Sequence, residues 1–267
     1  MKRLIALLLG LMCLTGCSGE KEWYLAEEFW HVQGQSQRIS YQYDEDWNLS
    51  VCVYQDGSIY ERTEYTYDDR GELLREQVTD GRNLLHEIQY TITRDEDGRV
   101  IRREKIRDGQ LIETEDFAYE EDTLRERKDV CYAFDRAETV TEEYEDGLLI
   151  RCTRETKIGN RIAASVTDYR YENGYLVEES SDLYRLAYTY ENGELIRKEY
   201  ILNGSHQSSW EYAYSDDTVA LTQYDEFGTV IAREVSTYDH AGNLIRVEYY
   251  DGAEKLWQYV SYQYITP

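Results

Sequence analysis

The residue types that carry enzyme chemistry occur in this chain, but their spacing does not assemble a site. The four histidines, His31, His86, His206 and His240, are scattered and form no H-E-x-x-H or similar ligand pattern. No G-x-S-x-G turn marks a serine nucleophile. Carboxylate pairs occur in nearly every predicted turn, so none stands out as a glycosidase couple. The sequence therefore predicts no catalytic residue, no metal site and no cofactor.

Acidic side chains cluster in short turns such as Asp44-Glu45-Asp46 and Asp95-Glu96-Asp97-Gly98. Such runs place several oxygens together, as a weak calcium site would. They lack the EF-hand spacing, however, and turn carboxylates commonly bond their own backbone amides. We interpret them as turn-forming residues, with weak calcium binding as the alternative.

The charge balance limits the partners. The formal net charge is −25, and removal of Lys2 and Arg3 with a signal peptide makes it −27. Nucleic acid is excluded as a partner, because its binding needs positive charge along one face. The same charge should keep the body off an anionic membrane, so that only a lipid would hold it there.

The N-terminus has the features of an exported lipoprotein. Met1-Lys2-Arg3 is basic, and the apolar run from Leu4 to Leu14 is too short to span a bilayer, which takes about twenty residues. The run ends in Leu14-Thr15-Gly16-Cys17, which resembles the bacterial lipobox. We therefore predict cleavage before Cys17 and lipidation of that residue, with an ordinary secretory signal as the alternative. Cys13 would leave with the signal peptide.

Three further cysteines lie in the mature body, at Cys52, Cys131 and Cys152. Cys131 and Cys152 are separated by nearly one repeat, so they are candidates for a disulfide across neighbouring hairpins in an exported compartment. Three buried, unpaired thiols are an equally good interpretation. No C-x-x-C occurs, so no zinc knuckle is predicted.

The elements that would position any site come from one repeating pattern, Y-x-Y-D-x-x-G-x-L, seen from Tyr65 to Leu73. Tyr-x-Tyr places two rings on one face of a strand, because side chains alternate between faces. Asp and Gly then provide a turn, and Leu begins the returning strand. Each motif therefore predicts the tip of a β-hairpin, and shorter Asp-Gly or Asn-Gly turns lie between the motifs.

The pattern returns at intervals of 19 to 27 residues, which identifies an internal repeat array. The second Tyr of the motif, or its replacement, falls at Tyr43, Tyr67, Ile92, Tyr119, Tyr144, Tyr171, Tyr190, Tyr214, Tyr238 and Tyr262. These residues resemble the YD repeat, or Rhs-type repeat, although Trp47 stands where Gly is expected. The resemblance implies an all-β repeat sheet or shell and no particular chemistry. Repeats of cell-wall-binding and MORN-type proteins are similar more weakly.

We predict an all-β fold in which antiparallel hairpins form an elongated, twisted or superhelical sheet. A closed barrel or a two-layer sandwich is the alternative. The expected divisions are a signal peptide over 1–16, a lipid-anchored tether and N-terminal cap over 17–38, and the YD-like repeat domain over 39–267. Trp23-Tyr24-Leu25 could begin a first strand or a capping helical turn.

The predicted function is that of a non-catalytic cell-surface lipoprotein, anchored to a bacterial membrane by its lipid and facing outside the cytoplasm. Its extended β face would bind a partner or serve as a structural spacer, and the candidate partners are a glycan, the cell wall or another surface protein. Tyr67, Tyr190, Tyr214 and Tyr238 occupy equivalent repeat positions and are the ligand-binding candidates. The alternative role for these rings is to hold adjacent hairpins together. An enzyme with a dispersed acidic site is a further alternative.

Overall fold

The computed structural model describes residues 23–32, 34–121, 123–133 and 136–266, and the regular structure in these ranges is β-strand. The strands are β1 (Tyr24–Val32), β2 (Gln35–Tyr43), β3 (Leu49–Asp56), β4 (Ile59–Tyr67), β5 (Leu73–Thr79), β6 (Leu84–Arg94), β7 (Val100–Arg107), β8 (Gln110–Glu120), β9 (Thr123–Ala133), β10 (Arg136–Glu145), β11 (Leu148–Ile158), β12 (Arg161–Glu172), β13 (Tyr175–Ser180), β14 (Tyr184–Glu191), β15 (Glu194–Leu202), β16 (Ser205–Tyr214), β17 (Thr218–Tyr224), β18 (Val230–Tyr238), β19 (Leu244–Asp251) and β20 (Leu256–Ile265). Within the described ranges, no helix is long and apolar enough to cross a membrane.

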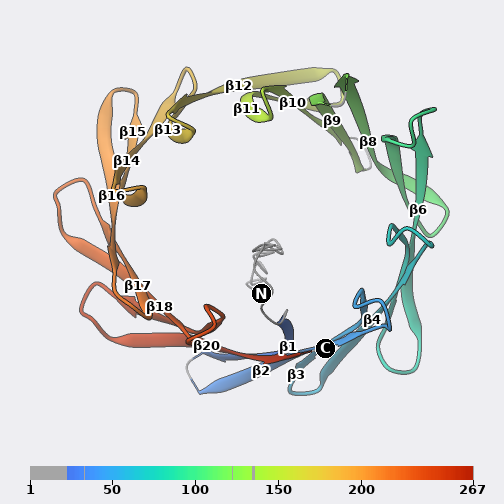
Figure 1. The fold of residues 1–267 in the computed structure, drawn as a ribbon, viewed down its shortest axis with the longest axis horizontal. Coiled ribbons are helices and arrows are strands. Elements are labelled where there is room, and N and C mark those ends of the chain that lie inside the picture. The colour runs from blue at the N-terminus through green and yellow to red at the C-terminus, as the bar shows by residue number, and fades with distance from the viewer. Residues whose placement is uncertain (1–22, 33, 122, 134–135, 267) are drawn as a thin grey trace.

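The strands form one closed barrel. Each strand pairs antiparallel with its neighbours in sequence, and β1 also pairs with β20, from Tyr24 opposite Ile265 to Val32 opposite Gln258. Figure 1 shows the resulting ring, with the first and last strands side by side. The all-β hairpin array is therefore confirmed. Its form is the closed barrel, which the sequence left as the alternative to an open, elongated sheet.

Each motif turn is built from local hydrogen bonds. In the β4–β5 turn, the Asp68 Oδ1 accepts the backbone N–H groups of Arg70 (2.9 Å) and Glu72 (2.9 Å). Gly71 takes a φ of 79°, in the left-handed region that glycine enters without a Cβ clash. Tyr67 then pairs with Leu73 across the turn. The Tyr, Asp, Gly and Leu of the motif thus have separate geometric roles.

A β-bulge next to most of the motif tyrosines bends the wall. The register shifts between Thr66 and Tyr67 in the β4–β5 pair, and the shift recurs beside Tyr43, Tyr190 and Tyr238. Bulges bend a strand and increase its local twist. Repeated around the array, they supply the curvature that brings β20 back to β1.

The position of glycine in the motif turn can be filled by another residue when other contacts compensate. Trp47, which replaces this glycine in the β2–β3 turn, has a φ of 63°. Its ring packs against Tyr24 with centroids 4.5 Å apart. This contact across the end of β1 offsets part of the cost of a non-glycine residue in the left-handed region.

The structure does not support a separate cap in the segment 17–38, which was expected to form a tether and an N-terminal cap. Residues 17–22 lie outside the described part of the chain, as does the signal peptide over 1–16. Residues 24–32 form β1 and residues 35–38 the start of β2, and β1 closes the barrel on β20. The N-terminal segment that the sequence presented as a cap is therefore an integral strand of the ring.

Side chains alternate between the two faces of the wall. We call the face that carries Tyr65 and Tyr67 the tyrosine face, and the face that carries Arg62 and Glu64 the ion-pair face. Ion pairs recur on the second face at Arg62–Glu64 (2.9 Å), Arg102–Asp116 (2.8 Å), Arg151–Asp168 (2.7 Å), Arg197–Glu211 (3.0 Å) and Arg246–Glu248 (2.8 Å).

The apolar core is thin, as a single curved layer requires. Its buried members are Val51, Val78, Ile88, Val247 and Val260. Most other strand residues are half-buried. Stability must therefore come largely from cross-strand pairs and from the closed hydrogen-bond ladder.

Candidate binding surfaces

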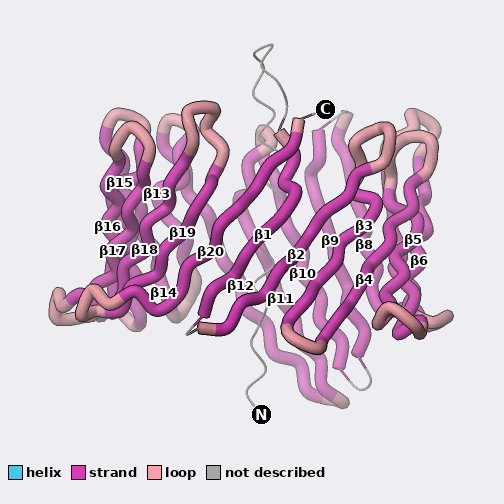
Figure 2. The backbone as a smooth tube through the Cα atoms, turned by 90° about the horizontal axis from the view of Figure 1, so that it is seen from below, coloured by secondary structure: helices cyan, strands magenta, loops and turns pink. Residues whose placement is uncertain are grey.

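The four candidate tyrosines lie on one rim of the barrel. Because consecutive strands are antiparallel, all even-numbered strands end at the same rim, where the C-terminus lies (Figure 2). Tyr67, Tyr190, Tyr214 and Tyr238 lie at or next to the ends of β4, β14, β16 and β18. Going round the wall from β14 to β4, this rim also carries Tyr264 and Tyr43. The structure thus brings the equivalent tyrosines into one row.

Two repeats differ from the sequence assignment. β20 places Tyr264 at the rim, and β6 places Arg94 there, so Tyr262 and Ile92 sit two residues further into the wall. The Arg94 guanidinium takes over part of the tyrosine's role, since it donates to the Gly98 carbonyl (2.8 Å) and pairs with Glu72 (2.9 Å). Both repeats have a register shift beside the rim residue, whereas the pairing of β16 with β17, at Tyr214, has none.

Several rim tyrosines use their hydroxyl groups to hold neighbouring strands. The hydroxyl donates to a backbone carbonyl at the start of the preceding strand in the pairs Tyr43–Leu25 (2.7 Å), Tyr67–Leu49 (2.9 Å), Tyr119–Val100 (3.0 Å), Tyr214–Leu195 (2.8 Å) and Tyr264–Leu244 (2.8 Å). Burial raises the pKa of Tyr43 and of Tyr264 to about 12. These contacts give the row a structural role.

Part of the row nevertheless presents exposed rings. Tyr214 is 40% exposed, and Tyr175, at the start of β13, is 43% exposed. Tyr175 packs against Tyr190 with ring centroids 5.0 Å apart. Tyr175, Tyr190 and Tyr214 therefore form an aromatic patch on the rim, which we call the rim patch.

The acidic turns are engaged with their own backbone. Asp95 Oδ1 accepts the N–H groups of Asp97 (3.0 Å) and Arg99 (2.9 Å), and Asp44 bonds the N–H groups of Asp46 and Asn48 in the same way. The described residues include no cluster of three or more His, Cys, Asp or Glu side chains that could hold a metal ion. The turn-forming interpretation accounts for these carboxylates.

The cysteines of the body are free thiols in this structure. Cys131 on β9 lies opposite Glu138 of β10, whereas Cys152 on β11 lies opposite Glu142. The intervening strand and the offset along it keep Cys131 and Cys152 from facing each other, so the candidate disulfide is not formed. Burial raises the pKa of Cys52 to about 11, and it raises the pKa values of Cys131 and Cys152 as well. Raised pKa values disfavour the nucleophilic thiolate.

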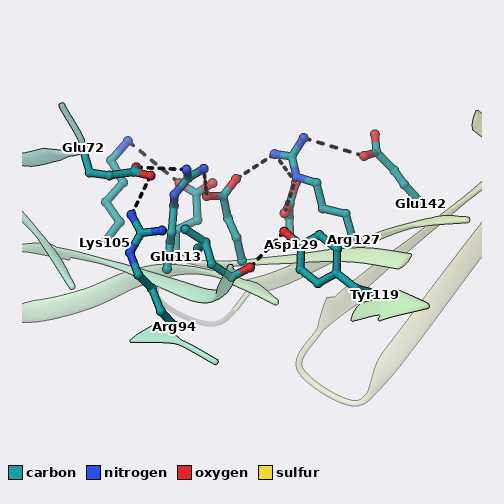
Figure 3. A network of polar contacts seen from close by, with 11 residues as sticks. Glu72, Arg94, Lys105, Glu113, Tyr119, Arg127, Asp129 and Glu142 are labelled. Atoms are coloured by element: carbon teal, nitrogen blue, oxygen red, sulfur yellow. Dashed lines mark hydrogen bonds and ion pairs between the residues drawn. The ribbon is translucent and has the colours of Figure 1, made fainter. Parts of the chain in front are cut away.

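A chain of ion pairs crosses the tyrosine face from the β4–β5 turn to β10 (Figure 3). Glu72, at the end of the β4–β5 turn, contacts Arg94 (2.9 Å) and Arg103 of β7 (3.2 Å). Arg103 also faces Glu115 of β8 (3.7 Å) and lies over the ring of Phe117. The cations of this network are thus shared between carboxylates that come from different hairpins.

Arg127 of β9 continues the chain. It contacts Glu115 (2.7 Å), Asp129 (2.9 Å) and Glu142 of β10 (3.7 Å). Burial raises the pKa of Asp129, although Arg127 opposes that change. Because each guanidinium already faces carboxylates, the network joins strands and leaves no cation of its own open to an anionic ligand.

Charged side chains occupy the middle of the strands on both faces. In β7, Arg102 and Glu104 lie on the ion-pair face, and Arg103 and Lys105 alternate with them on the tyrosine face. Lys105 pairs with Glu113 (3.9 Å) across the tyrosine face. Both sides of the wall at β7 therefore have the polarity of a surface in contact with water.

Comparisons with known proteins find no matching family model and no matching curated protein. The similar solved structures include a porin-like protein from Bacteroides uniformis, at 12% identity and a TM-score of 0.34, covering 90% of this chain and 96% of that chain. A porin-like protein from Bacteroides vulgatus has 12% identity, a TM-score of 0.36, and coverage of 91% and 99%. TcdB2-TccC3 without its hypervariable C-terminal region has 12% identity and a TM-score of 0.29, covering 89% of this chain and 19% of that chain. At these scores the similarities assign neither a family nor a function.

Proposed function

We propose that this protein is an exported, lipid-anchored and non-enzymatic β-barrel that stands in water beside a bacterial membrane and binds a partner through its surface. The observation that carries the proposal is the alternation of Arg102, Arg103, Glu104 and Lys105 between the two faces of β7. An Arg or Lys on the lipid face of a membrane barrel costs about 2–4 kcal/mol at the bilayer midplane. Charge on both faces favours a wall with water on each side.

Attachment to the membrane would then depend on the lipid at Cys17. This residue lies outside the described part of the chain, and the support is the basic start, the short apolar run and Leu14-Thr15-Gly16-Cys17. A non-catalytic role belongs to the same proposal. The body thiols have raised pKa values, and the turn carboxylates and several tyrosine hydroxyls are bonded to backbone.

Fractionation of the Cys17→Ser variant tests both the lipid anchor and the water-exposed barrel wall. The wild-type protein should enter the detergent phase, and Cys17→Ser should remain in the aqueous phase as a folded barrel. Cys13→Ser, in the same segment but before the predicted cleavage site, is the matched control and should behave as wild type. A Cys17→Ser protein that stays in the membrane fraction after removal of peripheral proteins would indicate a membrane-spanning wall.

A glycan or cell-wall ligand at the rim patch is the second candidate function. It is supported by the exposed rings of Tyr175 and Tyr214, since exposed aromatic rings offer stacking surfaces to sugars. A row of similar shallow sites could engage an extended polymer at several points.

Binding to a glycan and cell-wall panel tests the second candidate. Tyr214→Ala should weaken binding, whereas Tyr214→Phe keeps the ring, loses only the hydroxyl bond to Leu195, and should bind as wild type. Equal binding by both variants would remove the rim patch as the site. Loss of folding in Tyr214→Ala alone would assign the ring a structural role.

A further inference from the structure

The β11–β12 hairpin leaves one edge of the barrel wall open. β12 pairs with β11 along its length, from Cys152 opposite Thr167 to Ile158 opposite Arg161. Its pairing with β13 begins only at Asp168, opposite Ser180. The segment Arg161–Thr167, which we call the open edge, therefore has a partner strand on one side only.

The open edge is longer than the unpaired segment at the start of any other described even-numbered strand. Most even-numbered strands extend past the following strand because the barrel is sheared, and the next longest unpaired segments are Leu84–Glu87 on β6 and Ser205–Ser208 on β16. The excess at β12 comes from the short hairpin that follows it. β13 spans only Tyr175–Ser180, and β14 begins at Tyr184.

The backbone groups of the open edge have a defined direction. The hairpin turn contains only Gly159 and Asn160, and in such a turn the flanking residues, Ile158 and Arg161, exchange hydrogen bonds. Because bonding alternates along an antiparallel pair, the N–H and C=O groups of Ile162, Ala164 and Val166 point away from β11. These groups are the template that an added strand would use.

The side chains on this edge do not protect it. Natural edge strands are usually blunted by charge, proline or bulges. Residues 162–167 are uncharged, and Ile162 and Val166, which share a face, are 67% and 42% exposed. Ala163, Ala164 and Ser165 are exposed as well and are small enough to let another chain approach.

The two faces of the open edge differ in charge. Arg161, at the start of the edge, lies on the tyrosine face with Ala163 and Ser165, whereas Lys157 and Glu155 of β11 lie opposite Ile162 and Ala164 on the other face. Arg161 is exposed and forms no ion pair with any described residue, although the body as a whole is strongly acidic. An unpaired cation beside small uncharged side chains favours a partner whose acidic side chains lie on the tyrosine face.

A hollow of about 590 Å³ begins where the open edge ends. Its lining includes Ser180, which pairs with Asp168, together with Arg185, His206, Asp182 and Glu199. The His206 Nε2 atom is buried and has no hydrogen-bond partner among the described residues. Arg185 already faces Glu178 at 3.8 Å, so the hollow offers room, rather than an unpaired cation, to a chain that runs along β12.

We propose that the open edge of β12 is a docking site for an extended acidic segment of another protein, which adds to the wall as a further strand. Backbone bonds to Ile162, Ala164 and Val166 would give affinity, and apolar side chains of the segment would pack beside Ile162 and Val166. Glutamate or aspartate side chains that alternate with them would lie on the tyrosine face, near Arg161. This inference goes beyond the proposed function and does not depend on the lipid at Cys17.

Fluorescence anisotropy with the full-length protein in detergent tests the proposal. The probe is a capped, labelled peptide of alternating valine and glutamate, compared with the same peptide carrying lysine in place of glutamate. Ala164→Pro removes the central free N–H without touching the β11 ladder and should weaken binding of the acidic peptide at least about tenfold. The control Ala164→Ser keeps the N–H and should bind as wild type.

Charge and backbone contributions can be separated with further probes. The Arg161→Glu protein should lose the acidic peptide and gain the lysine peptide. A peptide methylated on alternate backbone nitrogens, on the bonding side, should fail to bind the wild-type protein; this readout does not depend on the folding of any variant.

Three results would overturn the proposal. They are no binding of the acidic peptide, equal binding by Ala164→Pro and Ala164→Ser, and equal binding of the acidic and lysine peptides. Sedimentation velocity supplies the remaining outcome, because a wild-type dimer that Ala164→Pro dissociates would identify a second copy of the chain as the occupant. The repelling net charge of two such acidic bodies argues for the heterologous segment.

Discussion

The hydroxyl of Tyr67, at the end of β4, donates a hydrogen bond of 2.9 Å to the backbone carbonyl of Leu49, at the start of β3. The two residues stand at one rim of the same hairpin, and the bond ties the last residue of one strand to the first of its neighbour. The same relationship recurs around the ring, from Tyr43 to Tyr264. The motif tyrosine is thus a strand tie as well as a source of ring area.

Tyr67→Phe should lower stability by about 1 kcal/mol, because a typical intramolecular hydrogen bond contributes that much. The ring and its packing remain, so the barrel should still fold. Tyr190→Phe is the matched control, since the Tyr190 hydroxyl makes no hydrogen bond to any described residue, and its denaturation midpoint should stay near that of wild type. Equal midpoints for Tyr67→Phe and Tyr190→Phe in urea would show that the bond to Leu49 contributes nothing.

We expect the free energy of unfolding to fall in acid, because the turn carboxylates become protonated. Backbone hydrogen bonds from Glu72 and Arg70 hold the pKa of Asp68 below its usual value, and bonds from Asn83 do the same for Asp80. A lowered folded-state pKa gives stability that is present above the unfolded pKa, about 3.9, and is lost as pH falls through the folded value.

The Asp68→Asn/Asp80→Asn protein keeps the acceptor oxygens without the titration, so its urea midpoint should decline less steeply below about pH 4 than that of wild type. Asp69→Asn is the control and should follow the wild-type curve, because the Asp69 carboxylate accepts no hydrogen bond within the described part of the chain. A pH dependence unchanged in the double variant would contradict the assignment.

Gly98→Ala should destabilise the β6–β7 turn through the backbone alone. Gly98 has a φ of 84°, and a Cβ built there meets no atom within 4 Å. The left-handed conformation costs about 1–2 kcal/mol for a residue with a Cβ. Gly98→Asn should lose less stability than Gly98→Ala, because asparagine tolerates the left-handed region better. Thermal denaturation that places Gly98→Ala level with wild type would mean that the turn rearranges.

Glu234→Gln should stabilise the protein at neutral pH. Glu234 lies on the tyrosine face of β18, opposite Tyr249, and burial raises its pKa. A raised folded-state pKa means that the residue supports folding most below the unfolded value, about 4.3, and costs stability as pH rises through the folded value. The gain from Glu234→Gln should therefore disappear in acid.

The control for Glu234→Gln is Glu248→Gln on the neighbouring strand. Glu248 lies on the ion-pair face and contacts Arg246 at 2.8 Å, so its neutralisation should not stabilise the protein at pH 7. Chemical denaturation of both variants at neutral and acid pH provides the measurement. A Glu234→Gln protein that is no more stable than wild type at neutral pH would show that the carboxylate is solvated.

The strands and turns could be predicted because the interactions that specify them are short-range. Asp68 bonds amides two and four residues away, Gly71 supplies the positive φ between them, and Tyr67 pairs with Leu73 just across the turn. The candidate tyrosines fell on one rim for the same reason, since a regular hairpin returns equivalent residues to the same end of the wall. Lipidation of Cys17 rests on the sequence alone.

Closure and the open edge were decided by the tertiary structure. The pairing of Tyr24 with Ile265 joins the two ends of the chain, and it depends on bends added up over every bulge, which no single motif encodes. The open edge had one sequence signal, the interval of 19 residues between Tyr171 and Tyr190, the shortest in the array. A shortened repeat could equally have shortened β12. Only the pairing of Asp168 with Ser180 shows that β13 and β14 are the shortened strands, which leaves Arg161–Thr167 without a second partner strand. The reason is that the hydrogen-bond register, unlike a turn, is set by contacts across the whole sheet.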